Sequence, residues 1–391
     1  MPTEPLQASW KKIAPLFLGH LVNDGYASFF APLLPLLIDR LDLSLTMAGL
    51  LGTLRIVTNS MIQPALGHLA DRVRRPFLVI VGPFLTICAM GFIGKAASYQ
   101  QLVVLLVVAG IGTALFHPAA ASLVAAIAQR RRGLMMAFFS SGGAVGGAIA
   151  PLVIVAYVGA FGMWRTPWLI LPAGGGLLAI AAVVARNRFS YPTGADSQTA
   201  FSLRAVPSML VLLWFVIVLR SLTETAFSSF LAVLITERGG STFAGGAGIS
   251  VFLLAGALGG FLGGSLADRV GAKWILFVSV ALAPPFYLLF LHGPSSLALA
   301  CLAAAGLFTF SSIPVGVVAA QELLPGKIGL VSGLVMGFAW GVGGLALTPI
   351  GWLADRFGLV PVMTGVACVP LIAGGLVLFY REGRVQYDTD D

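Results

Sequence analysis

The chain has 391 residues, of which 58% are hydrophobic and 10% are charged, whereas an ordinary soluble domain carries about 25% charged residues. This composition excludes a water-soluble globular protein. Because one bilayer crossing takes about 20 residues, a chain of this length has room for many crossings and none for a second, soluble domain. The net charge of +8 would suit a nucleic-acid partner only if the cationic side chains shared one water-facing surface.

Apolar runs of spanning length follow one another along the whole chain. They lie near residues 13–38, 46–69, 76–95, 99–128, 133–160, 166–185, 206–235, 243–266, 273–291, 295–322, 328–352 and 359–380. Proline and glycine inside these runs do not argue against helices, because membrane helices tolerate both. We therefore predict an all-α membrane protein with twelve transmembrane helices, the first of which is retained rather than removed as a signal peptide.

The chain also divides near its midpoint. The largest polar interval inside it is 186–205, which we interpret as a cytoplasmic linker between an N-terminal six-helix bundle, 1–185, and a C-terminal bundle with a short cytoplasmic tail, 206–391. The string GHLADRVRRP beginning at Gly67 recurs as GSLADRVGAK beginning at Gly264. Two pseudo-symmetric halves of this kind are typical of transporters, with the substrate site between them.

The lysines and arginines predict the orientation. If the N-terminus lies inside, most of the 23 fall in inner segments, and the outer segments carry only Arg40, Lys95, Arg165, Arg238 and Arg356. Cytoplasmic loops carry the excess of positive charge in membrane proteins. We therefore expect a multi-pass protein of the cell membrane, the bacterial inner membrane, with both termini in the cytoplasm. Because the cations are spread over short inner segments, nucleic acid is excluded as a partner.

Ionisable residues inside the predicted spans mark candidate functional positions. A charge at bilayer depth costs at least about 2.5 kcal/mol on insertion scales and normally faces a protein interior or a water-filled cavity. The deepest candidates are His20, Asp24, Arg55, His117, Arg220 and Glu224. His20 and Asp24 are four residues apart, as are Arg220 and Glu224, so each pair shares one helix face.

A buried carboxyl group can carry a transported proton. Burial favours its neutral form, whereas a nearby arginine favours its charged form. We predict that Asp24, with Glu224 as the second candidate, takes up and releases the coupling proton, and that Arg55 and Arg220 supply countercharge. A protonated carboxyl would free its arginine to attract an anionic group of the substrate. The alternative is that these are permanently satisfied structural pairs.

Aromatic side chains supply the other part of a predicted binding site, although most of the aromatic residues are expected in ordinary packing. The predicted substrate-binding residues are His20, Tyr26, Arg55, His117, Arg220 and Phe227. This set suits a small anionic or amphiphilic organic compound better than a bare inorganic ion. For His117, which precedes Pro118, the alternative is a hydrogen bond to a backbone carbonyl that the proline frees.

The repeated loop carries a family resemblance. GHLADRVRRP resembles the signature loop of the major facilitator superfamily, and GSLADRVGAK resembles its second copy. The resemblance implies the two-bundle fold and assigns a role in latching the cytoplasmic gate to Gly67, Asp71, Arg72, Gly264, Asp268 and Arg269. The alternative is that both are simple inside-facing turns. A third, similar string, GWLADRFG from Gly351, falls at the outer end of its predicted helix, so we do not assign it this role.

The fifth predicted helix contains SSGGAVGGAIAP, residues 140–151. This string resembles in part a glycine-rich motif of antiporters in the same superfamily. Gly142 and Gly146, like Gly143 and Gly147, are four apart and form a flat stripe that allows close helix contact. Ordinary small-residue packing explains the stripe equally well, so the motif favours export only weakly.

Three segments carry a closer resemblance, namely GHLVNDGYASFFAPLLPLL from Gly19, QPALGHLADR from Gln63 and GIGTALFHPAAASL from Gly110. They are similar to the fosmidomycin-resistance subgroup of drug efflux proteins. The resemblance implies drug/proton antiport and a role in antibiotic resistance. After the FHP of residues 116–118 this chain has Ala119, where the subgroup typically has an acidic residue, so the substrate's identity is not carried over.

Two other functions remain open at this point. A proton-coupled symporter that imports an organic anion would use the same residues, and a membrane-embedded acyltransferase would use the string H-x-x-x-D-G of His20, Asp24 and Gly25. No G-x-x-x-x-G-K-[ST] motif occurs, so an ion gradient must supply the energy. We expect no cofactor, no metal site and no catalytic residues. The expected partners are a small-molecule substrate, protons and the lipid bilayer, and we expect a monomer.

Overall fold

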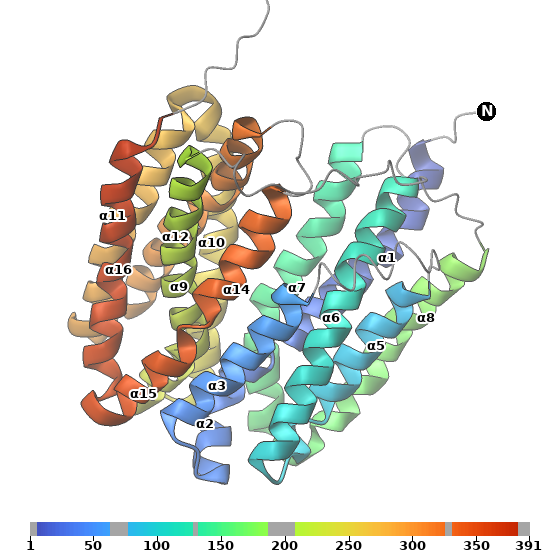
Figure 1. Ribbon diagram of the computed structural model, residues 1–391. Coiled ribbons are helices and arrows are strands. Elements are labelled where there is room, and N and C mark those ends of the chain that lie inside the picture. The colour runs from blue at the N-terminus through green and yellow to red at the C-terminus, as the bar shows by residue number, and fades with distance from the viewer. Residues whose placement is uncertain (1–5, 63–76, 128–131, 187–207, 325–330, 382–391) are drawn as a thin grey trace, which may run out of the picture. The chain divides into compact units, whose positions relative to one another are not determined.

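The computed structural model of the chain describes residues 6–62, 77–127, 132–186, 208–324 and 331–381. Every regular element in these ranges is a helix or a helical turn (Figure 1). The elements up to residue 186 are α1 Leu6–Ala27, α2 Phe30–Leu41, α3 Leu45–Ile56, the π-turn η1 Val57–Met61, α5 Leu78–Gly91, η2 Ile93–Lys95, α6 Tyr99–Ile127, α7 Arg132–Phe161, η3 Met163–Leu169 and α8 Ile170–Arg186.

The remaining elements follow the residues that are not described around the chain's midpoint. They are α9 Ser208–Glu237, α10 Thr242–Val270, α11 Ala272–His292, η5 Ser295–Leu297, α12 Ala298–Leu323, the π-turn η7 Gly333–Phe338, α14 Ala339–Gly344, α15 Leu347–Phe357 and α16 Leu359–Phe379. Helix makes up most of each of the twelve predicted apolar runs within the described residues, with short turns at 28–29, at 92 and at 345–346. The predicted all-α membrane fold is thereby confirmed.

Ten helical segments are long and apolar enough to cross a membrane within the described residues. The two other predicted runs are those near 46–69 and 166–185. The first of these contains α3 and η1 and continues into residues 63–76, which lie outside the described part. The second contains α8, whose 17 residues follow the short 3₁₀ turn η3.

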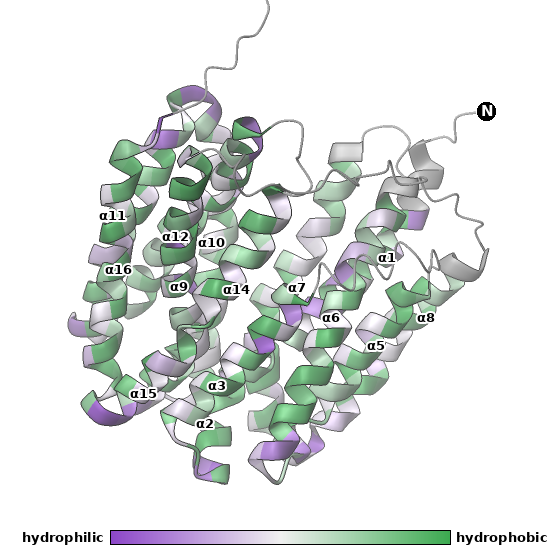
Figure 2. Ribbon diagram, in the orientation of Figure 1, coloured by the Kyte–Doolittle hydropathy of each residue, from purple (hydrophilic) through white to green (hydrophobic). Residues whose placement is uncertain are grey.

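The helix surfaces are apolar where a soluble protein would be polar. Phe261, Leu178 and Phe379 each expose more than two thirds of their surface, at 74%, 73% and 72%. Hydrophobic residues cover the middle of the helices, and hydrophilic ones gather mainly toward their ends (Figure 2). Such a surface is stable only against hydrocarbon, which is the environment of a membrane-spanning bundle.

Contacts between residues divide the chain into two compact units. The first comprises Met1–Thr199 with Ser229–Ser250, and the second comprises Ala200–Ser228 with Val251–Asp391. The first unit thus contains the predicted N-terminal bundle together with a segment that begins late in α9 and ends early in α10. The predicted bounds 1–185, 186–205 and 206–391 stay a prediction, and the proposed linker lies largely outside the described residues.

Glycines on α7 shape the core of the first unit. A Cβ atom added to Gly142 would come within 2.5 Å of the carbonyl oxygen of Phe17, and one added to Gly146 would overlap the backbone of Leu21. The predicted glycine stripe therefore brings α7 into close contact with α1. Beside this contact lies a core whose fully buried members include Ile13, Leu16, Phe116, Leu123, Met135 and Ile180.

The second unit packs α11 against α12 and α16 around a separate apolar core. Its buried members include Leu213, Leu276, Val280, Val335, Ala339 and Val377. On α10, a Cβ at Gly259 or Gly263 would overlap the backbone of α12. Small residues thus allow close helix contacts in this unit as well, through van der Waals packing.

The string A-D-R-x-G ends a helix in both described copies. Gly271 after α10 and Gly358 after α15 have φ of 90° and 85°, and their amides donate to the carbonyls of Ala267 and Ala354. Glycine adopts such positive φ values without strain, which suits a helix C-terminus. The third similar string, GWLADRFG from Gly351, is therefore explained by its role in ending a helix.

The predicted gating residues fall on both sides of the described boundary. Asp268 and Arg269 lie exposed in the last turn of α10, and Gly264 lies one turn earlier, where a Cβ would meet the ring of Pro314 at 3.6 Å. The first copy, Gly67, Asp71 and Arg72, lies outside the described residues. A role in gating stays a prediction for both copies.

Candidate functional site

Asp24 lies in α1 at the centre of a cluster of hydrogen bonds in the first unit. Its Oδ2 atom is 3.1 Å from Nε2 of His20, and its Oδ1 atom is 3.0 Å from Nε2 of His117. The side-chain amide of Asn23 also donates to Oδ1, at 2.9 Å. The Asp24 side chain is 26% exposed, so the cluster is largely enclosed.

Two helices bring these groups together. His20 is one turn before Asp24 on α1, whereas His117 reaches the same carboxylate from α6. Space for the pair is left by Gly143 of α7, where a Cβ would come within 2.6 Å of Oδ2 of Asp24. The glycine stripe therefore positions this cluster as well as packing two helices together.

The His20 ring is held in one orientation. Its Nδ1 atom is 2.9 Å from the backbone carbonyl oxygen of Phe139 on α7. The ring also stacks on the Phe139 side chain, with centroids 4.4 Å apart, and meets the edge of the Phe116 ring. These contacts leave Nε2 of His20 directed at Asp24.

The cluster provides histidines rather than an arginine beside the buried carboxyl. The three ligand atoms of His20, Asp24 and His117 lie within 4.8 Å of one another, which is also close enough to hold a metal ion. The Nε2 atom of each histidine, however, faces a carboxylate oxygen at ordinary hydrogen-bond distance. The geometry is therefore that of a hydrogen-bonded cluster that can store a proton.

Other predicted residues of this unit lie elsewhere. Arg55 lies half-buried in the last turn of α3 and is not among the side chains that contact Asp24. Tyr26 is buried next to Phe29, and its hydroxyl donates to the backbone carbonyl of Leu169. Tyr26 therefore ties α1 to the end of η3.

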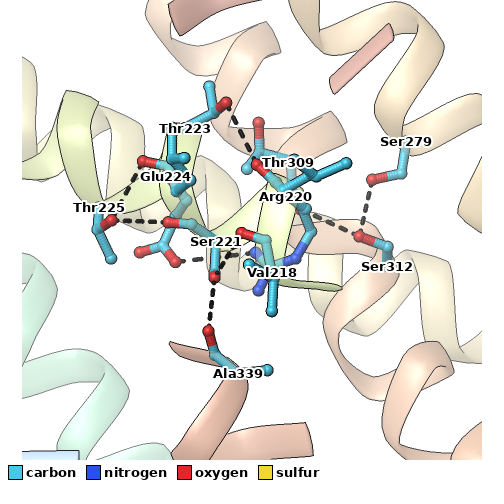
Figure 3. Close-up of polar contacts among 12 residues, drawn as sticks. Val218, Arg220, Ser221, Thr223, Glu224, Thr225, Ser279, Thr309, Ser312 and Ala339 are labelled. Carbon is cyan, nitrogen blue, oxygen red and sulfur yellow. Dashed lines mark hydrogen bonds and ion pairs between the residues drawn. The ribbon is translucent and has the colours of Figure 1, made fainter. Parts of the chain in front are cut away.

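The second unit contains a different polar cluster on α9 (Figure 3). A terminal guanidinium nitrogen, Nη1, of Arg220 is 3.8 Å from Oε2 of Glu224, and the two side chains are only 3% and 10% exposed. Neither Nη1 nor Nη2 of Arg220 has a hydrogen-bond partner. The guanidinium carbon lies 5.8 Å from the ring centroid of Trp340 on α14.

Hydroxyl groups anchor this part of α9 to its neighbours. Ser221 donates to the carbonyl of Ala339 on α14, and Thr223 donates to the carbonyl of Val366 on α16. Nearby, Ser279 of α11 donates to Ser312 of α12 at 2.8 Å (Figure 3). Hydrogen bonds from the residues that follow Arg220 on α9 therefore hold this part of the helix against α14 and α16.

A small cavity adjoins the guanidinium group. It has a volume of about 10 Å³ and is lined by Arg220, Ser312, Trp340 and apolar side chains that include Ile217 and Met336. A cavity of this size holds about one water molecule. Arg220 is thus a buried cation beside a small space whose walls are mostly apolar and include Ser312 and Trp340.

Phe227 is part of the packing beside this cluster. Its ring is fully buried and stacks on Tyr287 with centroids 3.9 Å apart. The Tyr287 hydroxyl in turn lies 2.8 Å from the hydroxyl of Thr309. A direct contact between Phe227 and a substrate stays a prediction.

Comparisons with known proteins agree with a transporter fold and extend over nearly the whole chain. A family model described as Major Facilitator Superfamily matches residues 16–344 and 213–389. The chain is 31% identical over 371 residues to a Bacillus subtilis (strain 168) protein described as the uncharacterized MFS-type transporter YfnC, an alignment that covers 92% of this chain and 90% of that protein.

A second relative carries a functional name. The chain is 27% identical over 391 residues to the fosmidomycin resistance protein of Escherichia coli (strain K12), with 98% of this chain and 95% of that protein covered.

Among solved structures, the fold is similar to a bacterial homologue of the human lysosomal transporter Spinster in an inward-facing, occupied conformation. The TM-score is 0.83 at 16% identity, and 97% of each chain is covered. A mutant of the nucleoside transporter NupG gives 0.74 at 13% identity, with 95% of this chain and 100% of that chain covered.

Proposed function

Because the chain belongs to the Major Facilitator Superfamily, a family of membrane transporters, we propose that it exports a small anionic or amphiphilic organic compound in exchange for protons. The relatives and the fold are those of transporters and not of enzymes. The H-x-x-x-D-G string on α1 is therefore no acyltransferase site. Its histidine and aspartate instead form the core of the Asp24 cluster.

The observation that carries the proton part of the proposal is the Asp24 cluster. The carboxyl of Asp24 is largely enclosed between two histidines. Each of these three groups can bind or release one proton, and they lie within hydrogen-bond distance of one another at the carboxyl. Histidine is the side chain whose ordinary charge change falls nearest physiological pH. Asp24 is accordingly the first candidate for the coupling proton, with Glu224 as the second.

The buried Arg220 is the observation that supports an anionic group on the proposed substrate. Its guanidinium is buried, its two terminal nitrogens lack hydrogen-bond partners, and it borders a small cavity. When Glu224 takes up a proton, it no longer neutralises the cation of Arg220 across the 3.8 Å contact, and the substrate's anion can take its place. When Glu224 loses the proton, the internal pair forms again and the anion is released.

The direction is proposed as export, toward the side opposite the cytoplasm. A relative named for resistance to fosmidomycin supports efflux, since export protects a cell from a drug. The distribution of lysines and arginines supports cytoplasmic termini in the bacterial inner membrane. A monomer is sufficient for this mechanism, because both clusters are formed within one chain.

Transport by the purified protein in liposomes tests the proposal. With an imposed pH gradient and a panel of labelled organic anions, we expect substrate to move opposite to the protons and to stop moving when an uncoupler is added. Asp24→Asn should abolish proton-driven transport, and Glu224→Gln should reduce it. Full proton coupling in both variants would contradict the assignment, and substrate that moves with the protons would show an uptake symporter instead.

A further inference from the structure

We propose that the transported proton is shared between Nε2 of His20 and Oδ2 of Asp24, and that the backbone carbonyl of Phe139 fixes it there by holding His20 in one tautomer. His20 is thereby part of the proton site itself, and α7 supplies the group that defines it. The inference rests on the proposed proton coupling and deepens it. It follows from counting the hydrogens that the observed contacts require.

The first step concerns Nδ1 of His20. A carbonyl oxygen only accepts hydrogen bonds, so the 2.9 Å contact with Phe139 requires a hydrogen on Nδ1. The stacked Phe139 ring and the close packing of α7 on α1 keep the imidazole in this position. A ring flip would break the hydrogen bond without offering Nδ1 another partner of the same kind.

The second step concerns Nε2. If His20 is neutral, its only hydrogen is on Nδ1 and Nε2 carries a lone pair. The 3.1 Å contact with Oδ2 of Asp24 then requires a hydrogen on the carboxyl group. If instead Nε2 carries the hydrogen, His20 is a cation and Asp24 is an anion. Both forms contain one shared proton, and in both the pair is neutral overall.

The third step places that proton at Oδ2 and not at Oδ1. Oδ1 accepts from the side-chain amide of Asn23 at 2.9 Å, and Nε2 of His117 lies 3.0 Å from the same oxygen. Because the Asn23 donor already makes Oδ1 an acceptor, we assign Oδ1 as the acceptor toward His117 as well. His117 then carries its hydrogen on Nε2, which is the opposite tautomer to that of His20. The whole cluster is neutral, the state that burial favours.

Release of the proton changes the geometry as well as the charge. When the shared proton passes to water, the cluster gains one negative charge, and lone pairs on Nε2 and Oδ2 then face each other at 3.1 Å. Because His20 is fixed by Phe139, the Asp24 carboxylate is the group that moves away. Proton release is thereby converted into a displacement on α1.

No other acidic or basic side chain competes for this proton in the described parts of the neighbouring helices. α6 supplies His117, whereas α5, α7 from Leu134 onward and α8 as far as Ala185 contain no aspartate, glutamate, lysine, arginine or histidine. The other titratable side chains there are Cys88 of α5, Tyr99 of α6 and Tyr157 of α7, and none is a partner of Asp24. His20, Asp24 and His117 are therefore the groups near this proton that can hold it, among the described residues of these helices.

Nitrogen-15 NMR of the histidine side chains in the full-length protein tests the tautomers directly. The chain has only four histidines, so single substitutions assign each signal. We expect neutral His20 to carry its hydrogen on Nδ1 and neutral His117 to carry it on Nε2. A hydrogen on Nε2 of neutral His20 would overturn the inference, whatever the transport assays show.

Transport by His20→Gln tests the function of the site. Glutamine fills a similar volume but does not accept a proton, so we expect proton-driven transport to fall at least about tenfold. The melting temperature of the variant in detergent should stay within a few degrees of the wild type, which shows that the variant is folded. The matched control is His292→Gln, at the exposed end of α11, which should leave both proton-driven transport and the melting temperature unchanged.

The outcomes separate the inference from the proposed function. If the wild-type protein shows no proton coupling, the proposed function fails, whereas the tautomers are still decided by NMR. If the wild type is coupled and His20→Gln keeps the wild-type dependence of transport on pH, only the inference fails. Loss of transport with a chelator and recovery with zinc would also overturn it, because the cluster would then hold a metal ion in place of the proton.

Discussion

The two buried clusters differ in how completely their polar atoms are satisfied. Both carboxyl oxygens of Asp24 have partners at hydrogen-bond distance, whereas two guanidinium nitrogens of Arg220 have no such partner. An unsatisfied buried donor costs about 1–3 kcal/mol, and more when it is charged. The Asp24 cluster is therefore stable as it stands, whereas Arg220 gains from an incoming acceptor.

Removal of the guanidinium should weaken the binding of an anionic substrate. We expect Arg220→Ala to raise the KM for such a substrate by about tenfold to a hundredfold, because charged hydrogen bonds contribute about 1.5–3 kcal/mol. Arg220→Lys should recover only part of the affinity, since lysine lacks the planar fork of donors. The measurement is initial transport rate against substrate concentration in liposomes.

A matched control is available on α15. Arg356 lies over the ring of Trp352, at 4.0 Å from its centroid, on the exposed surface at the end of that helix. Arg356→Ala should leave the KM unchanged. An equal rise of KM in both variants, or none in Arg220→Ala, would show that Arg220 does not bind the substrate.

At the level of elements, the contact between α1 and α7 determines the site. Gly142 and Gly146 let the backbones approach, and Gly143 leaves the space that His20 and Asp24 occupy. The same approach brings the carbonyl of Phe139 within reach of His20. A single helix pair thus provides both packing and the proton site.

Alanine substitution at two glycines of α7 should affect the stability of the protein differently. A Cβ at Gly146 would overlap the backbone of Leu21, whereas Gly159 has nothing within 4 Å of its added Cβ. We expect Gly146→Ala to destabilise by about 1–3 kcal/mol through overpacking. Gly159→Ala should be neutral or slightly stabilising, because alanine has a more favourable helix propensity than glycine, by up to about 1 kcal/mol.

Thermal unfolding in detergent measures both effects. The melting temperature of Gly146→Ala should fall by several degrees, and that of Gly159→Ala should stay equal or rise. Equal melting temperatures for both variants and the wild type would show that α7 does not need the close approach to α1.

At the scale of the whole molecule, the distribution of positive charge predicts the orientation in the membrane. The positive-inside bias places residues such as Arg381 on the cytoplasmic side and residues such as Arg165 and Arg238 on the other side. A fluorescent protein that folds only in the cytoplasm should therefore fluoresce when fused after residue 391.

A matched fusion tests the opposite side. The same reporter fused after residue 294, in the connection between α11 and η5, should remain dark, because that connection is expected to face outward. Fluorescence from this fusion together with a dark C-terminal fusion would reverse the proposed orientation, and with it the proposed direction of export.

Several features follow from local sequence. The apolar runs predict the helices, because a bilayer sets the length and polarity of a spanning segment. The four-residue spacings of His20 with Asp24 and of Arg220 with Glu224 predict pairs that the structure indeed forms at 3.1 and 3.8 Å. The glycine stripe of α7 likewise predicts a close helix contact, although only the structure shows that α1 is its partner.

Other features depend on how helices distant in sequence face one another. His117 is 93 residues from Asp24, and Phe139 is 119 residues from His20, so no local pattern predicts either contact. The Phe139 carbonyl leaves no trace in the sequence at all, because every residue has one. Arg55 is the opposite case. The sequence predicts that it lies within a membrane span, but only the structure shows that it does not contact Asp24.

The sequence by itself therefore determined the membrane fold, the family and the residues with buried charge, because the cost of polar atoms in hydrocarbon acts on each segment separately. The tertiary structure alone decided which partners those charges have on other helices. Asp24 meets two histidines and Arg220 keeps unsatisfied donors beside a cavity. These pairings depend on the rotation and close approach of packed helices, which glycines on α7 allow but which no single segment specifies.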